Sequence, residues 1–167
     1  SESPLPQVTV RGWVRTRRDS KACSFLEVGD GSGFRGIQVV VDAALSCAPL
    51  VQQILTGAAV EIDGALVASP ASGQKWEVQA SDLRLVGAAD GTYPLQKKGH
   101  TPEFLRTIAH LRPRTNLYGS VFRVRSRMSF AIHRFFNERG FFHVHTPIIT
   151  ASDCEGAGEM FRVTTLK

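Results

Sequence analysis

Long hydrophobic runs are absent from this sequence of 167 residues. No stretch of about 18 apolar residues occurs, which excludes a membrane-spanning helix. The first residues, SESP, carry neither the basic nor the apolar segment of an export signal. We therefore expect a protein of the cytoplasm.

Cysteine is scarce, and the three cysteines, Cys23, Cys47 and Cys154, show no CxxC or CxxH spacing. A disulfide framework and a zinc site are therefore not expected, and Cys154 has no evident base partner for a catalytic thiol. His143 and His145 lie two residues apart without a neighbouring acid, so we interpret them and His133 as packed or surface histidines. The sequence predicts no metal ligand and no catalytic residue.

Acidic residues are few in the second half. Residues 91–167 hold 12 Lys and Arg against 5 Asp and Glu, whereas residues 1–90 hold 8 against 10. Within the first half, residues 11–21 concentrate five positive charges against the single Asp19. This clustering indicates a polyanion such as nucleic acid as partner, with a solvated surface as the alternative.

Five segments between residues 7 and 87 have the composition of β-strands, and one short helical stretch, residues 43–55, follows the third of them. The expected strands comprise residues 8–11, 24–28, 36–41, 58–67 and 75–86. Gly12 is a possible bend or bulge after the first of them. This order predicts an all-β, OB-type five-stranded barrel over residues 1–88. A fragment of a five-stranded sandwich is the competing architecture.

Residues 89–101 are rich in glycine and polar side chains, which is typical of a linker between domains. Helical structure is expected to resume at Thr101 as N-cap and Pro102 as first helical residue. A long amphipathic helix is predicted from about Thr115, ending before Gly140. Residues 141–149 look like a strand that contains Pro147, so residues 102–167 are expected to be an α+β fragment.

Phe25 and Gln38 are expected on neighbouring strands of the barrel. An aromatic ring and an amide so placed can stack an unpaired base and hydrogen-bond its edge. Nearby arginines would hold phosphates without reading sequence. On its own, Phe25 is more often a core residue, and Gln38 is simply a polar strand residue.

Residues 139–149, RGFFHVHTPII, resemble motif 1 of class II aminoacyl-tRNA synthetases. The loop DCEGAGEMF, residues 153–161, and the segment HLRPRTN, residues 110–116, are similar to the asparaginyl branch; aspartyl relatives carry a loop of the PEGARD type. An N-terminal OB barrel is the layout of the aspartyl, asparaginyl and lysyl group, whose tRNAs share uridine as middle anticodon base.

The resemblance implies a role for individual residues. Phe25 would stack on the middle uridine, Gln38 would hydrogen-bond it, and Glu77 would read the first anticodon base. The stem phosphates would be held by Arg15, Arg17 and Arg18. Glu155 would belong to the flipping loop that closes over the α-ammonium group of the amino acid, and Pro147 would mark a homodimer contact.

The family joins asparagine to its tRNA with ATP and Mg²⁺, and it holds ATP with motifs 2 and 3. Neither motif occurs in these 167 residues. Because adenylate formation depends on stabilising the phosphoryl charge, we expect the chain alone to bind tRNA, to bind no cofactor and to be inactive. The alternative is a stand-alone OB module that binds single strands or mediates dimerisation, with strongly salt-dependent and unselective binding.

Overall fold

The computed structural model describes residues 3–150 and 161–165. Two compact units are present, one ending at Phe122 and the other starting at Arg123. No described helix is both long and apolar enough to cross a bilayer.

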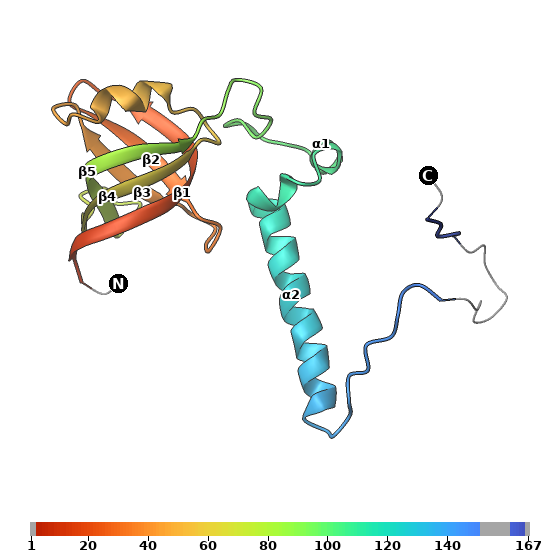
Figure 1. Ribbon diagram of the computed structural model, residues 1–167. Helices are drawn as coiled ribbons and strands as arrows, with labels where there is room; N and C mark the ends of the chain where they lie inside the picture. Colours follow the sequence, from red (N-terminus) through yellow and green to blue (C-terminus); the bar gives the residue numbers. More distant parts are fainter. Residues whose placement is uncertain (1–2, 151–160, 166–167) are drawn as a thin grey trace. The chain divides into compact units, whose positions relative to one another are not determined.

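Five strands make up most of the first unit: β1 (Leu5–Asp19), β2 (Cys23–Gly29), β3 (Ile37–Asp42), β4 (Ala59–Ala68) and β5 (Trp76–Gly87). They close into a barrel in the order β1-β2-β3-β5-β4 (Figure 1). All neighbours are antiparallel except β3 and β5, which pair in parallel. The expected OB-type barrel is confirmed, and the sandwich alternative is wrong.

Alternating side chains explain the barrel, because successive residues of a strand point to opposite faces. Leu26 and Val28 of β2 and Val39 and Val41 of β3 are almost completely buried. They pack in one core with residues from the other strands and from the segment between β3 and β4, namely Val14, Val51, Ile54, Ala58, Val60, Ile62, Val78 and Leu83. The residues between these inward positions, Phe25 and Gln38 among them, belong to the outer face.

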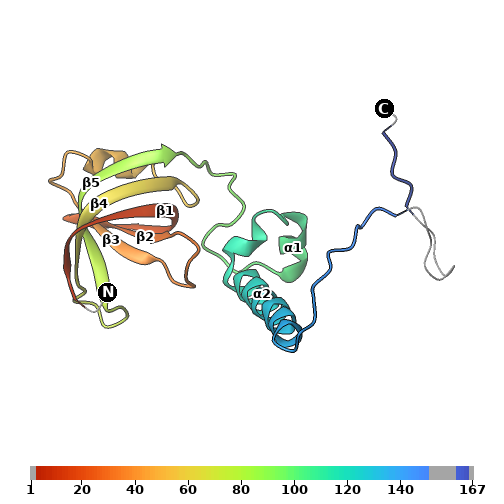
Figure 2. The same cartoon turned by 60° about the horizontal axis from the view of Figure 1, so that its bottom comes forward.

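The helical segment after β3 forms as predicted, but it is the short 3₁₀ helix η1 (Ala48–Gln53) with Pro49 in its first turn. Val51 and Ile54 enter the core, so η1 covers one end of the barrel (Figure 2). The carbonyls of Val51, Gln52 and Ile54 accept hydrogen bonds from Nη1 of Arg17 at 2.8, 3.2 and 3.0 Å. Arg17 therefore holds the carbonyl groups at the end of this helix.

Where β1 pairs with β2, a bulge lies at Arg15, and Gly12 is not the bulged residue. Val14 pairs with Val28 and Thr16 with Glu27, so β1 has one extra residue between them. Gly12 stands instead at a close approach of two backbones. A Cβ there would lie 2.6 Å from the carbonyl oxygen of Gly29.

Beyond the barrel, α1 (Pro102–Thr107) begins as predicted, with the Thr101 side chain accepting from the Phe104 amide. The 3₁₀ helix η2 (Arg112–Arg114) leads into α2 (Asn116–Asn137), which runs on into the second unit. Gly140, at φ +83°, ends this helix as predicted. The amide of Phe141 bonds to the carbonyl of Phe136 at 3.1 Å, and that of Gly140 to Asn137 at 3.0 Å.

The strand expected over residues 141–149 is not formed in the part of the chain that the structure describes. Residues 141–150 have no strand, and the side chains of Phe142 and Ile148 are more than nine-tenths exposed. A strand needs a neighbouring strand for its amides and carbonyls, so an apolar, strand-like composition does not suffice. Pro147 lies in this irregular stretch.

Candidate nucleic-acid interface

Phe25 and Gln38 line the same groove on the outer face of the barrel, as the alternation predicts. Its volume is about 560 Å³. Phe25 is half-buried, so its ring is not sealed in the core. Because β2 and β3 are adjacent, the aromatic ring and the amide are presented to the same solvent-filled space.

Arg18 belongs to this groove and contacts both residues. Its guanidinium carbon lies 5.4 Å from the centre of the Phe25 ring, which is cation–π distance. Its Nη2 donates to Oε1 of Gln38 at 3.4 Å. Arg18 is therefore placed to add positive charge beside a flat ring, which suits a base and its phosphate.

Glu77 is the one buried charged residue among the described side chains, with 4% exposure. Its carboxylate accepts from the side chains of Gln38 at 3.2 Å and Ser69 at 2.9 Å. Gln74 and Gln79 donate to it as well, at 3.4 and 2.8 Å. The Gln38 amide is thus oriented from two sides, with its oxygen toward Arg18 and its nitrogen toward Glu77.

The structure does not bring Arg15 and Arg17 into this groove. Arg17 is bound to η1 and lies 3.3 Å from Asp19. Arg15 donates to the carbonyl of Phe34 and to the side chain of Asn116. Of the three arginines expected to hold phosphates, Arg18 alone lines the groove.

Several groove residues were missed at the level of sequence. They come from the start of β5, the loops before β3 and β5 and the linker, namely Arg35, Gln74, Lys75, Trp76 and Lys97. The Lys75 ammonium lies 5.4 Å from the Trp76 ring centre. The predicted OB topology contained the signal for Trp76, because this fold sets the start of β5 beside β3. The spacing of the linker residues gave no indication that Lys97 lines the groove.

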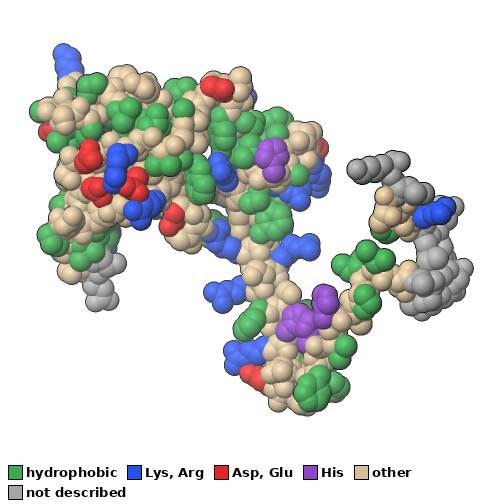
Figure 3. Space-filling model, in the orientation of Figure 1, with side chains coloured by type: hydrophobic (Ala, Val, Ile, Leu, Met, Phe, Trp, Pro, Cys, Tyr) green, Lys and Arg blue, Asp and Glu red, His purple; other side chains and the backbone are tan. Residues whose placement is uncertain are grey.

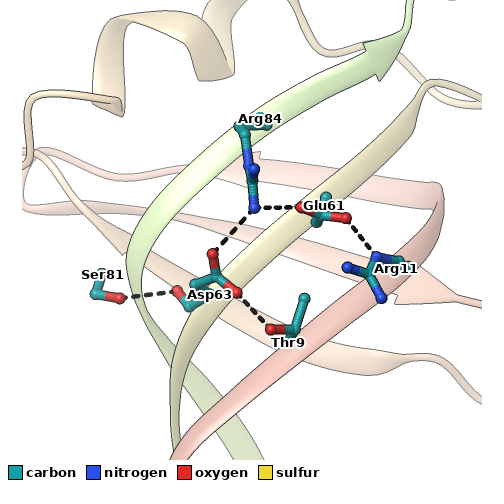
Figure 4. A network of polar contacts seen from close by, with 6 residues as sticks. All are labelled: Thr9, Arg11, Glu61, Asp63, Ser81 and Arg84. Carbon is teal, nitrogen blue, oxygen red and sulfur yellow. Dashed lines mark hydrogen bonds and ion pairs between the residues drawn. The ribbon is translucent and has the colours of Figure 1, made fainter.

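On the β1–β4–β5 surface the charges are paired with one another (Figure 4). There Glu61 pairs with both Arg11 and Arg84, and Asp63 pairs with Arg84 at 3.2 Å. The hydrogen bond and charge of Glu61 raise the pKa of Arg11. These cations are neutralised within the protein, whereas Arg18, Arg35, Lys75 and Lys97 give the groove a positive excess over Glu27.

Glu155 is outside the described residues, as is Cys154. His133 and His143 bring their rings within 4.4 Å of each other. No three His, Cys, Asp or Glu side chains gather into a metal site within residues 3–150 and 161–165.

Two family sequence models match the chain. The OB-fold nucleic acid binding domain of the tRNA anticodon type matches residues 8–86, and the class II tRNA synthetases (D, K and N) match residues 101–167. Together they cover the barrel and nearly everything after the linker.

Relatives of known function are similar over almost the whole chain. An asparagine–tRNA ligase of Nitratidesulfovibrio vulgaris (strain DP4) is 62% identical over 98% of this chain and 36% of the relative. One of Bacteroides fragilis (strain YCH46) is 59% identical over 95% of this chain and 34% of the relative. The chain therefore spans about a third of the length of these relatives.

Solved structures share the fold. Asparaginyl-tRNA synthetase from Pyrococcus horikoshii, complexed with asparaginyl-adenylate, has a TM-score of 0.78 at 22% identity, over 90% of this chain and 35% of that one. Aspartyl tRNA synthetase from Entamoeba histolytica has a TM-score of 0.72 at 19% identity, over 87% and 37%. At these identities the likeness concerns architecture alone.

Proposed function

We propose that this chain, which belongs to the class II tRNA synthetases of the D, K and N group, is the anticodon-binding part of an asparagine–tRNA ligase with the opening of its catalytic domain. The observation that carries the proposal is the shared groove of Phe25, Gln38 and Arg18 on an OB barrel. A ring, an oriented amide and a cation are what an unpaired RNA base requires.

In this proposal the middle anticodon base, a uridine, leaves the loop and stacks on Phe25. Gln38 then hydrogen-bonds the base edge, since its amide is already oriented by Arg18 and Glu77. Glu77, the second residue of β5, is buried and bonded to Gln38, and in this proposal it reads the first anticodon base. Arg18 neutralises an adjacent phosphate, which contributes affinity but no sequence information.

The activity of the whole enzyme is also part of the proposal. It would condense asparagine with ATP to an adenylate and transfer the asparaginyl group to the terminal ribose of the tRNA, in the cytoplasm. ATP and Mg²⁺ would supply the activated phosphoryl chemistry. The described residues offer no cluster that fits the metal, so we assign ATP and Mg²⁺ to no residue of this chain. Glu155 would meet the α-ammonium group of asparagine.

A homodimer through α2 and the Pro147 segment completes the proposal. Apolar side chains of α2 are widely exposed, and those of residues 141–149 even more so. Figure 3 shows green side chains gathered beyond the end of the helix. Faces of this kind are rarely left bare in monomers.

The binding proposal is tested with a synthetic anticodon stem-loop that carries the asparagine anticodon. Phe25→Ala removes the stacking surface, so affinity should fall by about 1–3 kcal/mol in isothermal titration calorimetry. Gln38→Ala should weaken binding and also reduce discrimination against a stem-loop whose middle uridine is replaced by cytidine.

Phe104→Ala is the matched control, because Phe104 is 40% exposed, is an aromatic residue and lies outside the groove. It should bind RNA like the unmodified chain. If Phe25→Ala and Gln38→Ala both keep full affinity and discrimination, the proposed site is wrong.

A further inference from the structure

Arg15 is the extra residue of the bulge in β1. Between Val14 and Thr16 the β1 strand advances by two residues while its β2 partner advances by one. A bulge re-aims the side chain that it contains. Arg15 therefore leaves the inward–outward alternation of the strand.

The guanidinium of Arg15 joins three separate segments of the first unit. Nη1 donates to the carbonyl of Phe34 in the β2–β3 loop at 2.6 Å and lies 3.9 Å from the Glu27 carboxylate. Nη2 donates to Oδ1 of Asn116, the first residue of α2, at 2.9 Å. A planar guanidinium with several fixed donors is suited to hold such a junction, which a lysine would not reproduce.

One side of this junction is the wall of the RNA groove. Glu27, Thr16 and Gly36 all line the groove. The Glu27 carboxylate accepts from the Gly36 amide at 3.3 Å and the Thr16 hydroxyl at 3.4 Å. An RNA phosphate that enters beside Glu27 repels this carboxylate and so alters the surroundings of Arg15.

The other side of the junction is the start of α2. A second set of contacts also connects the residues before α2 to the barrel and the linker. The Arg114 guanidinium lies 4.3 Å from the Trp13 ring centre and donates to the Tyr93 hydroxyl at 3.1 Å. Arg114 and Asn116 thus both connect the chain entering α2 to barrel and linker residues. A shift of the Arg15 side chain would therefore act on the start of α2, a segment that Arg114 also connects to the barrel.

We propose that Arg15 transmits occupancy of the RNA groove to the first turn of α2, and that it does not hold an RNA phosphate. The inference rests on the proposed function, since it requires RNA in the groove. It makes Arg15 a positioning residue, distinct in role from Arg18.

The first test separates a phosphate contact from a positioning role through salt. The affinity of the complete 167-residue chain for the anticodon stem-loop is measured at several salt concentrations. Arg18→Gln should reduce the slope of log affinity against log salt by about 0.7–0.9, the loss of one phosphate contact. Arg15→Gln should leave the slope unchanged. Arg84→Gln, on the ion-paired surface, controls for lost charge.

The second test observes transmission directly by NMR. Saturation with the stem-loop should move the backbone amide signals of Leu117 and Gly119 in the first turn of α2. Arg15→Gln should abolish that response while RNA still binds. Asn116→Ala removes the other end of the junction and should do the same with Arg15 in place. Asn116→Asp keeps the acceptor oxygen for Arg15, so the signals of Leu117 and Gly119 should again respond to the stem-loop.

Each outcome decides between the two claims. A lower salt slope in Arg15→Gln, or signals of Leu117 and Gly119 that respond equally with and without the junction, overturns the positioning role and leaves RNA binding intact. Failure of the unmodified chain to bind the stem-loop overturns the proposed function, and transmission with it.

Discussion

Gly57 shows how a single residue fixes the path between η1 and β4. Its backbone has φ +95°, and a Cβ there would lie 2.7 Å from the Tyr93 ring. Its amide donates to the carbonyl of Val14 at 2.7 Å. The position is thus constrained by its dihedral angle, by the aromatic ring and by the hydrogen bond.

Gly57→Ala should therefore lower the free energy of unfolding by at least about 1–2 kcal/mol, the cost of left-handed backbone for an L-residue. Displacement of Tyr93 adds to that cost. Urea unfolding followed by circular dichroism measures it. Gly91→Ala is the control, because a Cβ at Gly91 meets nothing within 4 Å, and it should change stability by less than about 0.5 kcal/mol. Equal midpoints for the two variants would contradict this account.

At the same scale, the positions of some side chains follow from the sequence and those of others do not, for a physical reason. Phe25 and Gln38 follow from strand alternation, since their neighbours Leu26 and Val39 are core residues. Arg15 and Arg17 carry the same charge as Arg18. Arg15, at the bulge, is directed to Asn116, and Arg17 donates to a carbonyl of η1. Bulges depend on pairing with a distant strand, so their position is not readable from a local run of arginines.

Among the elements, α1 depends on its first residue. The Thr101 side chain accepts from the Phe104 amide at 3.3 Å. Glu103 lies in the same first turn, where its own amide and the Thr101 hydroxyl hold the pKa of its carboxyl below the ordinary value. A lowered folded pKa means that this contribution is present above the unfolded pKa and is lost as pH falls through the folded one.

Thr101→Ala should destabilise α1 by about 0.5–2 kcal/mol, the usual cost of losing an N-cap. The pKa of Glu103 should rise toward its ordinary value, which an NMR titration of its carboxyl carbon would detect. Amide hydrogen exchange of Phe104 and Leu105 reports the local loss. Thr107→Ala, at the other end of the helix, should leave both readouts nearly unchanged; parallel losses in the two variants would refute the cap.

Elements with local signals were predictable, and those that need a partner were not. The start of α1, and the end of α2 before Gly140, follow from capping residues that act within one turn. The barrel strands follow from alternation and are stabilised by one another. Residues 141–149 have the composition of a strand without any described strand to pair with. Composition alone cannot supply that partner.

For the molecule as a whole, exposed apolar surface on α2 predicts self-association. Val124, Met128 and Ile132 follow one another at four-residue steps, and each is more than half exposed. Blue side chains also project along this helix in Figure 3, so its surface combines cations with apolar groups.

Met128→Glu should weaken association at least about tenfold, because a carboxylate loses hydration when that face is covered. Sedimentation equilibrium over a concentration series measures it. Ser126→Glu adds the same charge two residues away on another side of the helix and should have a smaller effect. A chain that stays monomeric at every concentration would rule out the dimer through α2.

The parallel pairing of β3 with β5 has a consequence during synthesis. Gln38 meets Glu77 across this pair, and β4 supplies the partner of both β1 and β5. As the polypeptide leaves the ribosome, the β1–β2–β3 meander has two open edges until β4 has emerged, and β3 and β4 then remain open edges until residues up to Gly87 have followed. Pausing of translation within that interval would prolong the exposure of bare strand edges, where wrong intermolecular pairing begins.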